Sequence, residues 1–138
     1  MFPPRSGACA CEIASVHTEF LITEYTDRVL VVATQIGKLG TVYHLRRDVP
    51  GELSLQRADA DALADDEGLA RCETLIGRRD DATLDACARR IGEVLFARGL
   101  EKPIVCALGL RSGCGLEAKR AVASTAIERA SELLGIAQ

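Results

Sequence analysis

The sequence predicts an α+β domain in which two helices pack on one face of a six-stranded, mainly antiparallel sheet. Three observations predict this class. β-rich runs separated by short turns fill the first third of the chain, two amphipathic helical stretches lie after residue 79, and two strands are apolar at successive positions. In chain order the predicted elements are βββββαβα. A chain of 138 residues is long enough for one hydrophobic core, so we expect a single domain over residues 8–135.

The most β-rich stretch runs from Arg28 to Arg47. Its first run carries no charge from Val29 to Gly37 and is rich in β-branched residues. The break Gly37–Gly40 follows, and then a second β-rich run, Thr41–Leu45. Two such runs around a short connection bounded by glycine predict a β-hairpin, in which the glycines adopt positive φ. Because the first run is apolar at successive positions, we expect it to be buried on both faces.

Two strands are expected before this stretch. Residues 1–7 contain two adjacent prolines and predict a disordered arm. Cys9–Ala14 and His17–Tyr25 then predict strands joined by a short turn. Strands that are close in sequence tend to be neighbours in the sheet, so these two and the hairpin predict an antiparallel meander of four strands.

An acidic segment, residues 48–70, follows the hairpin. It carries seven acidic residues against one basic residue and no aromatic residue. This composition favours a long, solvated loop rather than a part of the core. Loops of this length in compact domains are often functional. We expect its acidic cluster to contact a basic patch on a partner and to raise the association rate. The cluster consists of Asp59, Asp61, Asp65, Asp66 and Glu67.

The rest of the chain predicts two strands and two helices. The acidic pair Asp80-Asp81 suits the start of the first helix, whose apolar residues recur with a period of 3.6 until Gly99. Gly135 suits the residue that ends the second helix in the left-handed conformation. The two strands are Arg71–Gly77 and Ile104–Leu110, and the second helix is Leu116–Leu134.

Two helices cover only one face of such a sheet. The strands at 28–35 and 104–110 are apolar on both faces, so they present a second face that neither helix covers. An uncovered apolar sheet face is an association surface. We therefore expect a dimer, sheet face against sheet face, with a partner of the same or a related fold. The alternative is that residues 48–70 fold over this face. Their acidity argues against this alternative, because charged groups are costly to bury on an apolar surface.

Cys114 and Arg120 have the Cys-x5-Arg spacing at a strand-to-helix junction. Phosphatases and sulfurtransferases place an anion-binding loop at such a junction, where a thiolate is stabilised. Here the intervening residues are mostly helix formers rather than a glycine-rich cradle, which favours an ordinary connection. A Cys114-dependent phosphatase or sulfurtransferase is the alternative function.

The segment Gly37–Thr41 lacks the spacing of a phosphate-binding loop, and no helix follows it. We expect its central residues, Lys38 and Leu39, to contact a partner protein from an exposed turn.

Composition excludes several other classes. The net charge is −3 and no basic stripe is present, which argues against nucleic-acid binding. No apolar run approaches the length of a membrane span, and the N-terminus does not resemble a signal peptide, so we expect a cytoplasmic protein that also enters the nucleus. The six cysteines are expected to be free thiols. Two histidines and no C-x-x-C pair argue against a metal site, and no cofactor is expected.

The segment Val29–Thr41 resembles the central hairpin of the proteasome assembly chaperone 3 family, whose pattern there is L-V-V-V-T-Q-x-G-K-hydrophobic-G-T. The similarity continues through Thr74–Gly77, Ile104–Leu110 and the last helix from Glu117. It spans most of the chain, although residues 48–70 are longer and more acidic than that family's connection.

The resemblance implies a fold and a function. It implies a six-stranded antiparallel sheet with two helices and no catalytic residues. It also implies a non-enzymatic chaperone of 20S proteasome assembly that pairs with a related chaperone, the fourth of the set. Such a pair holds alpha subunits while the alpha ring forms and leaves as beta subunits are added. A homodimer of the isolated chain is the alternative pairing.

Overall fold

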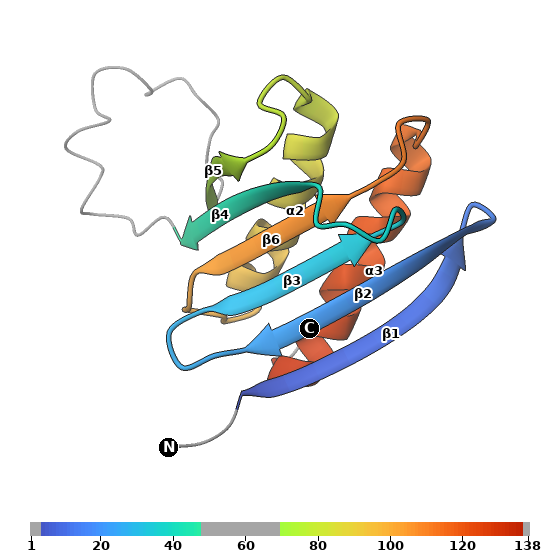
Figure 1. Cartoon of the computed structure of the whole chain (residues 1–138). Coiled ribbons are helices and arrows are strands. Elements are labelled where there is room, and N and C mark those ends of the chain that lie inside the picture. Colours follow the sequence, from blue (N-terminus) through green and yellow to red (C-terminus); the bar gives the residue numbers. More distant parts are fainter. Residues whose placement is uncertain (1–3, 48–69, 137–138) are drawn as a thin grey trace, which may run out of the picture.

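The computed structural model describes residues 4–47 and 70–136. It contains one six-stranded sheet, and both helices pack behind it on the same face (Figure 1). The predicted fold class and the order βββββαβα are therefore confirmed. The strands are β1 (Arg5–Ile13), β2 (Val16–Glu24), β3 (Val29–Thr34), β4 (Thr41–Arg47), β5 (Ala70–Ile76) and β6 (Ile104–Gly109). The helices are α2 (Ala82–Ala97) and α3 (Leu116–Leu134).

The strand order in the sheet is β1-β2-β3-β6-β4-β5. β6 lies between β3 and β4, parallel to β3 and antiparallel to β4. The predicted hairpin between β3 and β4 is therefore wrong, and only β1, β2 and β3 form the consecutive antiparallel pairs of the predicted meander. The strand that separates β3 from β4 comes from a distant part of the chain.

The connection between β3 and β4, residues 35–40, passes over the end of β6. It must span two strand spacings, about 10 Å, which a connection of this length can do. Thr34 holds it in place. The Thr34 hydroxyl donates to the carbonyl oxygen of Lys38 at 2.7 Å and accepts from the backbone N–H groups of Ile36 and Lys38, each at 3.2 Å.

Two glycines make this crossing sterically feasible. A Cβ atom on Gly40 would lie 2.3 Å from the carbonyl oxygen of Leu108, and Gly40 has a φ of +72°. On the other side of the contact, a Cβ on Gly109 would lie 2.3 Å from the carbonyl oxygen of Lys38. The glycine-bounded break in the sequence therefore marks where the chain crosses β6, not where a hairpin turns.

The first strand begins earlier than the sequence indicated. Residues 5–7 belong to β1, although the sequence assigned them to an arm. The register pairs Arg5 with Glu24 and Ser6 with Thr23, so these backbone groups find partners in β2. Ala14 and Ser15 join the two strands with φ values of 53° and 66°, the positive pair that a two-residue hairpin turn requires.

The main core lies between the sheet and the helices. α2 packs against β4, β5 and β6, whereas α3 packs against β1, β2 and β3. Asp81 caps α2 by accepting from the backbone N–H of Leu84 at 3.0 Å, and Gly135 ends α3 with a φ of +69°, as predicted for both residues. The largest fully buried side chains include Tyr43, Phe20, Phe96, Ile22, Leu45, Ile91 and Leu95.

Glu24 at the end of β2 ties three segments together, and it makes stability sensitive to acid. Its carboxylate accepts hydrogen bonds from Lys102 Nζ and from Arg5 Nε, both at 2.9 Å. The bond from Lys102, followed by that from Arg5, lowers the pKa of Glu24 below its ordinary value of 4.5. A carboxyl group with a lowered folded-state pKa stabilises the fold above its unfolded-state pKa, and this stabilisation is lost as pH falls through the folded-state pKa.

Glu24→Gln is therefore expected to lower the free energy of unfolding by about 1 kcal/mol at pH 7. The difference should shrink as pH falls below about 4.5, because protonation removes the same charge from the wild type. Urea denaturation between pH 3 and pH 7 measures both effects. A difference that is the same at every pH would contradict the assigned role of the Glu24 charge.

Candidate protein-interaction face

The face of the sheet opposite the helices, here called the open face, carries an apolar residue from every strand. The strand register places these residues directly opposite one another across neighbouring strands. In sheet order they are Ala8, Leu21, Val32, Ala107, Val42 and Ile76, here called the apolar row. The row is continuous only because β6 lies between β3 and β4.

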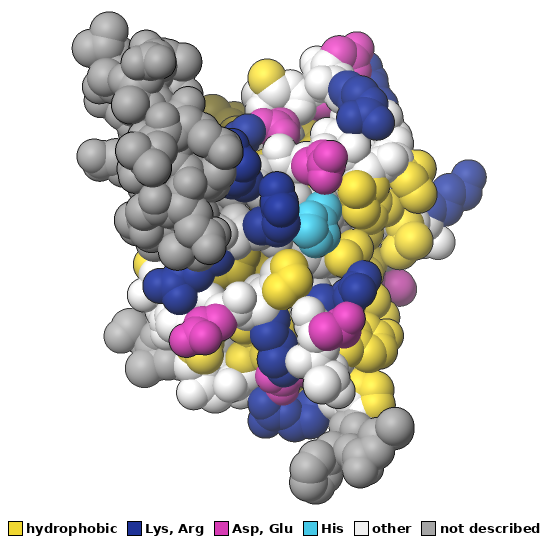
Figure 2. Space-filling model, turned by 90° about the vertical axis from the view of Figure 1, so that its left-hand side faces the viewer, with side chains coloured by type: hydrophobic (Ala, Val, Ile, Leu, Met, Phe, Trp, Pro, Cys, Tyr) yellow, Lys and Arg dark blue, Asp and Glu magenta, His cyan; other side chains and the backbone are white. Residues whose placement is uncertain are grey.

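The centre of the apolar row forms a second hydrophobic cluster, separate from the main core. Val32, Ala107 and Val42 are its buried members, with exposed fractions of 7%, 1% and 9%. Leu21, Leu30 and Val105 pack against them and are partly buried. Hydrophobic side chains gather on the right-hand side of Figure 2, the side toward which the open face points. The cluster thus lies on the helix-free side of β3, β6 and β4, with its centre screened by Leu21, Leu30 and Val105.

A second row of residues lies two positions along each strand, or three along β5 where the register shifts, and is apolar only at its centre. Leu30 and Val105 occupy that centre, next to Val32 and Ala107 of the apolar row. The full second row is Ser6, Thr23, Leu30, Val105, His44 and Glu73. An apolar centre with polar surroundings is the usual anatomy of a protein–protein interface.

One corner of the open face is basic. Arg46 of β4 and Arg71 of β5 lie directly opposite each other in the register, and both are exposed. Neither side chain has an ion-pair or hydrogen-bond partner within residues 4–47 and 70–136. Like charges directly across a pair of strands destabilise the sheet. An acidic group from a bound partner would relieve this repulsion, so the corner favours a partner with negative charge at the matching position.

Of the site residues predicted from the sequence, Lys38 and Leu39 are described, and they lie off the apolar row. Lys38 and Leu39 are on the connection over the end of β6, where Leu39 is 55% exposed and the neighbouring Ile36 is 46% exposed. The acidic cluster Asp59, Asp61, Asp65, Asp66 and Glu67 lies outside the described residues. Partner contact by these residues stays a prediction.

Cys114 and Arg120 do not build the anion-binding loop that their spacing suggested. Cys114 lines a cavity of about 540 Å³ beside Ile13 and Arg111, whereas Arg120 lines a different cavity between the two helices. Burial raises the pKa of the Cys114 thiol, which Lys119 offsets only in part. A nucleophilic cysteine needs a lowered thiol pKa instead, because the thiolate is the reactive form.

The described residues contain no group of three or more His, Cys, Asp or Glu side chains that is placed to hold a metal ion. In the same part of the chain, no helix has the length and apolar character needed to cross a membrane. All six cysteines are free thiols.

A one-sided helix layer and an apolar open face are features of the class of protein–protein association modules. The particular family of this protein follows from its sequence. The family model described as proteasome assembly chaperone 3 matches residues 31–128, which is 98 of the 138 residues. The chain therefore belongs to the proteasome assembly chaperone 3 family, and the resemblance found in the sequence is confirmed.

Two further comparisons place the chain among known proteins. Proteasome assembly chaperone 3 of Nematostella vectensis is 45% identical over 47 residues, which cover 34% of this chain and 35% of that protein. The match thus spans about a third of the relative. A chain in a crystal structure of a novel chaperone complex for yeast 20S proteasome assembly matches with a TM-score of 0.53 and 13% identity. That match covers 95% of this chain and 96% of the yeast chain, and at this identity it shows a shared fold.

Proposed function

We propose that this protein is a chaperone of 20S proteasome assembly that acts by binding. In this proposal it pairs with a structurally related chaperone through the open face, and the pair holds alpha subunits while the alpha ring forms. The observation that carries the proposal is the apolar row, which neither helix covers, in a chain that belongs to the proteasome assembly chaperone 3 family. The protein would work in the cytoplasm and the nucleus.

The chemistry of the open face supports pairing with another sheet. Val32, Val42 and Ala107 form the low apolar centre of the open face, of the kind that packs sheet on sheet at about 10 Å. Burial of apolar surface contributes about 25 cal/mol per Å² before the entropy lost on association is subtracted, and the partly exposed Leu21, Leu30 and Val105 have surface left to bury. Within the described residues the side chains of Arg46 and Arg71 have no acidic partner, which favours a related chaperone with an acidic corner.

The mechanism that follows is stabilisation of one arrangement of subunits. A protein that binds one arrangement of alpha subunits and not its competitors shifts the equilibrium toward that arrangement by mass action. An incoming subunit that overlaps the chaperone must then displace it, so the affinity is expected to be moderate. No chemical step is required, and the raised pKa of Cys114 gives no support to the enzymatic alternative.

Native co-purification tests the proposal. A tagged full-length chain, expressed in its own cells and recovered under mild conditions, is expected to bring down a related assembly chaperone and proteasome alpha subunits. Mass spectrometry identifies them. The Cys114→Ser variant is the matched control and should recover the same proteins in the same amounts. Loss of recovery with Cys114→Ser, or absence of both classes from the wild-type sample, would contradict the proposal.

A further inference from the structure

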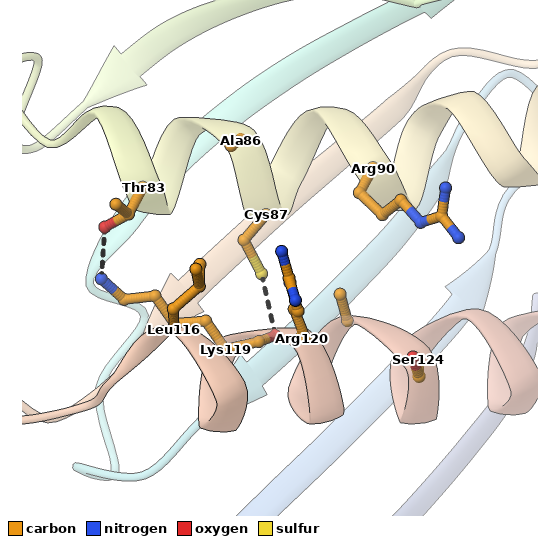
Figure 3. A pocket seen from close by; sticks show the side chains of 9 residues that line it. Thr83, Ala86, Cys87, Arg90, Leu116, Lys119, Arg120 and Ser124 are labelled. Atoms are coloured by element: carbon orange, nitrogen blue, oxygen red, sulfur yellow. Dashed lines mark hydrogen bonds between the residues drawn. The ribbon is translucent and has the colours of Figure 1, made fainter.

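A groove runs along the outer surface between α2 and α3 (Figure 3). The two helices are parallel here, so Thr83 and Leu116 lie at one end of the groove and Arg90 and Ser124 at the other. Its volume is about 460 Å³. The lining residues recur at helical spacing on each helix: Thr83, Ala86, Cys87 and Arg90 on α2, and Leu116, Lys119, Arg120, Ala123 and Ser124 on α3.

The floor of the groove is small and apolar. Ala86 and Ala123 leave room between the helices, and the Cys87 thiol donates to the carbonyl oxygen of Lys119 at 3.6 Å. The Lys119 ammonium group donates to the Thr83 hydroxyl and lies 4.0 Å from the Asp81 carboxylate. Lys119 therefore fastens one helix to the other, and its charge is largely satisfied within the protein.

Two arginines on the rim of the groove, Arg90 and Arg120, are available to pair with a carboxylate of a partner. Arg90 is exposed and has no ion-pair or hydrogen-bond partner within the described residues. Arg120 is 3.6 Å from Glu117, but the two side chains are 69% and 91% exposed. Such an exposed pair contributes little energy, so Arg120 is available to another carboxylate. The groove thus combines an apolar floor with a positively charged rim.

We propose that this groove docks an acidic amphipathic helix of a proteasome alpha subunit. This inference rests on the proposed function. The open face lies on the other side of the sheet from the helices (Figure 1), so a chaperone paired there leaves the groove exposed. In the docked state, carboxylates of the alpha-subunit helix pair with Arg90 and Arg120, and one of its apolar side chains contacts Leu116 and Ala86.

The geometry favours a helix over an extended segment. The groove is formed by two helices and offers no sheet edge whose backbone groups could pair with a strand. A docked helix satisfies its own backbone hydrogen bonds, whereas an extended segment would leave its N–H and C=O groups unpaired. Arginine binds carboxylates in a bidentate manner, which fixes the register of the docked helix.

The test uses the full-length chain with its related chaperone and recombinant alpha subunits, added one at a time. Arg90→Glu/Arg120→Glu is expected to weaken the binding of the alpha subunit by at least about tenfold at 0.15 M salt, because each reversal replaces an attraction by a repulsion. Arg78→Glu/Arg129→Glu is the matched control, since it makes the same change in net charge at exposed arginines outside the groove. Biolayer interferometry measures both affinities.

Three further readouts separate the outcomes. Circular dichroism melting is expected to be the same for both double variants, and Arg90→Gln/Arg120→Gln should show an intermediate loss of binding. Pairing with the related chaperone, followed by light scattering, should survive in all variants. Equal binding of the alpha subunit by wild type and the groove variant would overturn this inference and leave the proposed function intact. Failure of the wild type to bind any alpha subunit would overturn both.

Discussion

Leu30→Asp is expected to abolish pairing with the related chaperone while the chain remains folded. Leu30 lies on the open face beside the centre of the apolar row and is only partly buried, so in the unpaired chain a carboxylate at this position reaches water. In the paired state the same carboxylate would be buried against apolar side chains without a partner. This costs several kcal/mol, which weakens pairing on the order of 100-fold or more.

The next residue supplies the matched comparison. Val31 lies on the opposite face of the same strand and is fully buried in the main core. Val31→Asp is therefore expected to unfold the chain, whereas Leu30→Asp should cost at most about 1 kcal/mol of stability. Ala82→Glu, an exposed change at the start of α2, controls for added negative charge. Quantitative pull-down and urea denaturation measure the two effects, and a Leu30→Asp chain that still pairs would contradict the role of the open face.

Gly40→Ala is expected to destabilise the fold by about 2–4 kcal/mol. The new Cβ would lie 2.3 Å from the carbonyl oxygen of Leu108 and 2.6 Å from the Cα of Gly109, so the connection over β6 must move. Both neighbours are backbone atoms and cannot rotate away. The positive φ of Gly40 adds strain to this clash.

Alanine substitutions at two other glycines separate the effect of the steric clash from the effect of the positive φ. Gly37 has a φ of +71° but nothing within 4 Å of its Cβ position, so Gly37→Ala should cost only about 1 kcal/mol. Gly113 has neither constraint, and Gly113→Ala should be close to neutral. The unfolding free energies from urea denaturation should therefore decrease in the order Gly113→Ala, Gly37→Ala, Gly40→Ala. Equal costs for Gly37→Ala and Gly40→Ala would support a simple hairpin and contradict the crossing.

The sequence predicts the elements of this fold well because each element has a local cause. α3 occupies Leu116–Leu134 and ends at Gly135, as its apolar period and its terminal glycine indicate. The cap of α2 at Asp81 has a similar local basis. These features depend on residues within a few positions of one another, so one stretch of sequence is sufficient to reveal them.

The pairing of the strands has no such local cause. β3 and β4 are separated by six residues, and the strand between them, β6, begins 57 residues after the end of β4. Gly40 and Gly109 carry the signal, because each has no Cβ where the other segment passes. That signal is visible only when the two glycines are considered as a contacting pair. The apolar row was missed as a set of residues for the same reason, since it depends on the register across all six strands.

The groove between the helices was also missed. Arg120 was considered with Cys114, six residues earlier, whereas in the structure its charged neighbour across the groove is Arg90 of α2. Arg90 lies on the exposed side of α2, whereas the apolar period of this helix identifies only its buried side. The uncovered apolar face of the sheet is predictable from the sequence. The prediction needs only the apolar character of two strands and the number of helices, and both can be seen in the sequence directly.

Photo-crosslinking from the open face tests the central claim most directly. A photoreactive benzoylphenylalanine at His44, which is half-buried in the second row, is placed in the tagged full-length chain and irradiated in native extract. The same group at Arg129 on the exposed side of α3 serves as the control. Position 44, and not position 129, is expected to form a crosslink to a related assembly chaperone. Crosslinks to that chaperone from position 129 alone would show that pairing does not use the open face.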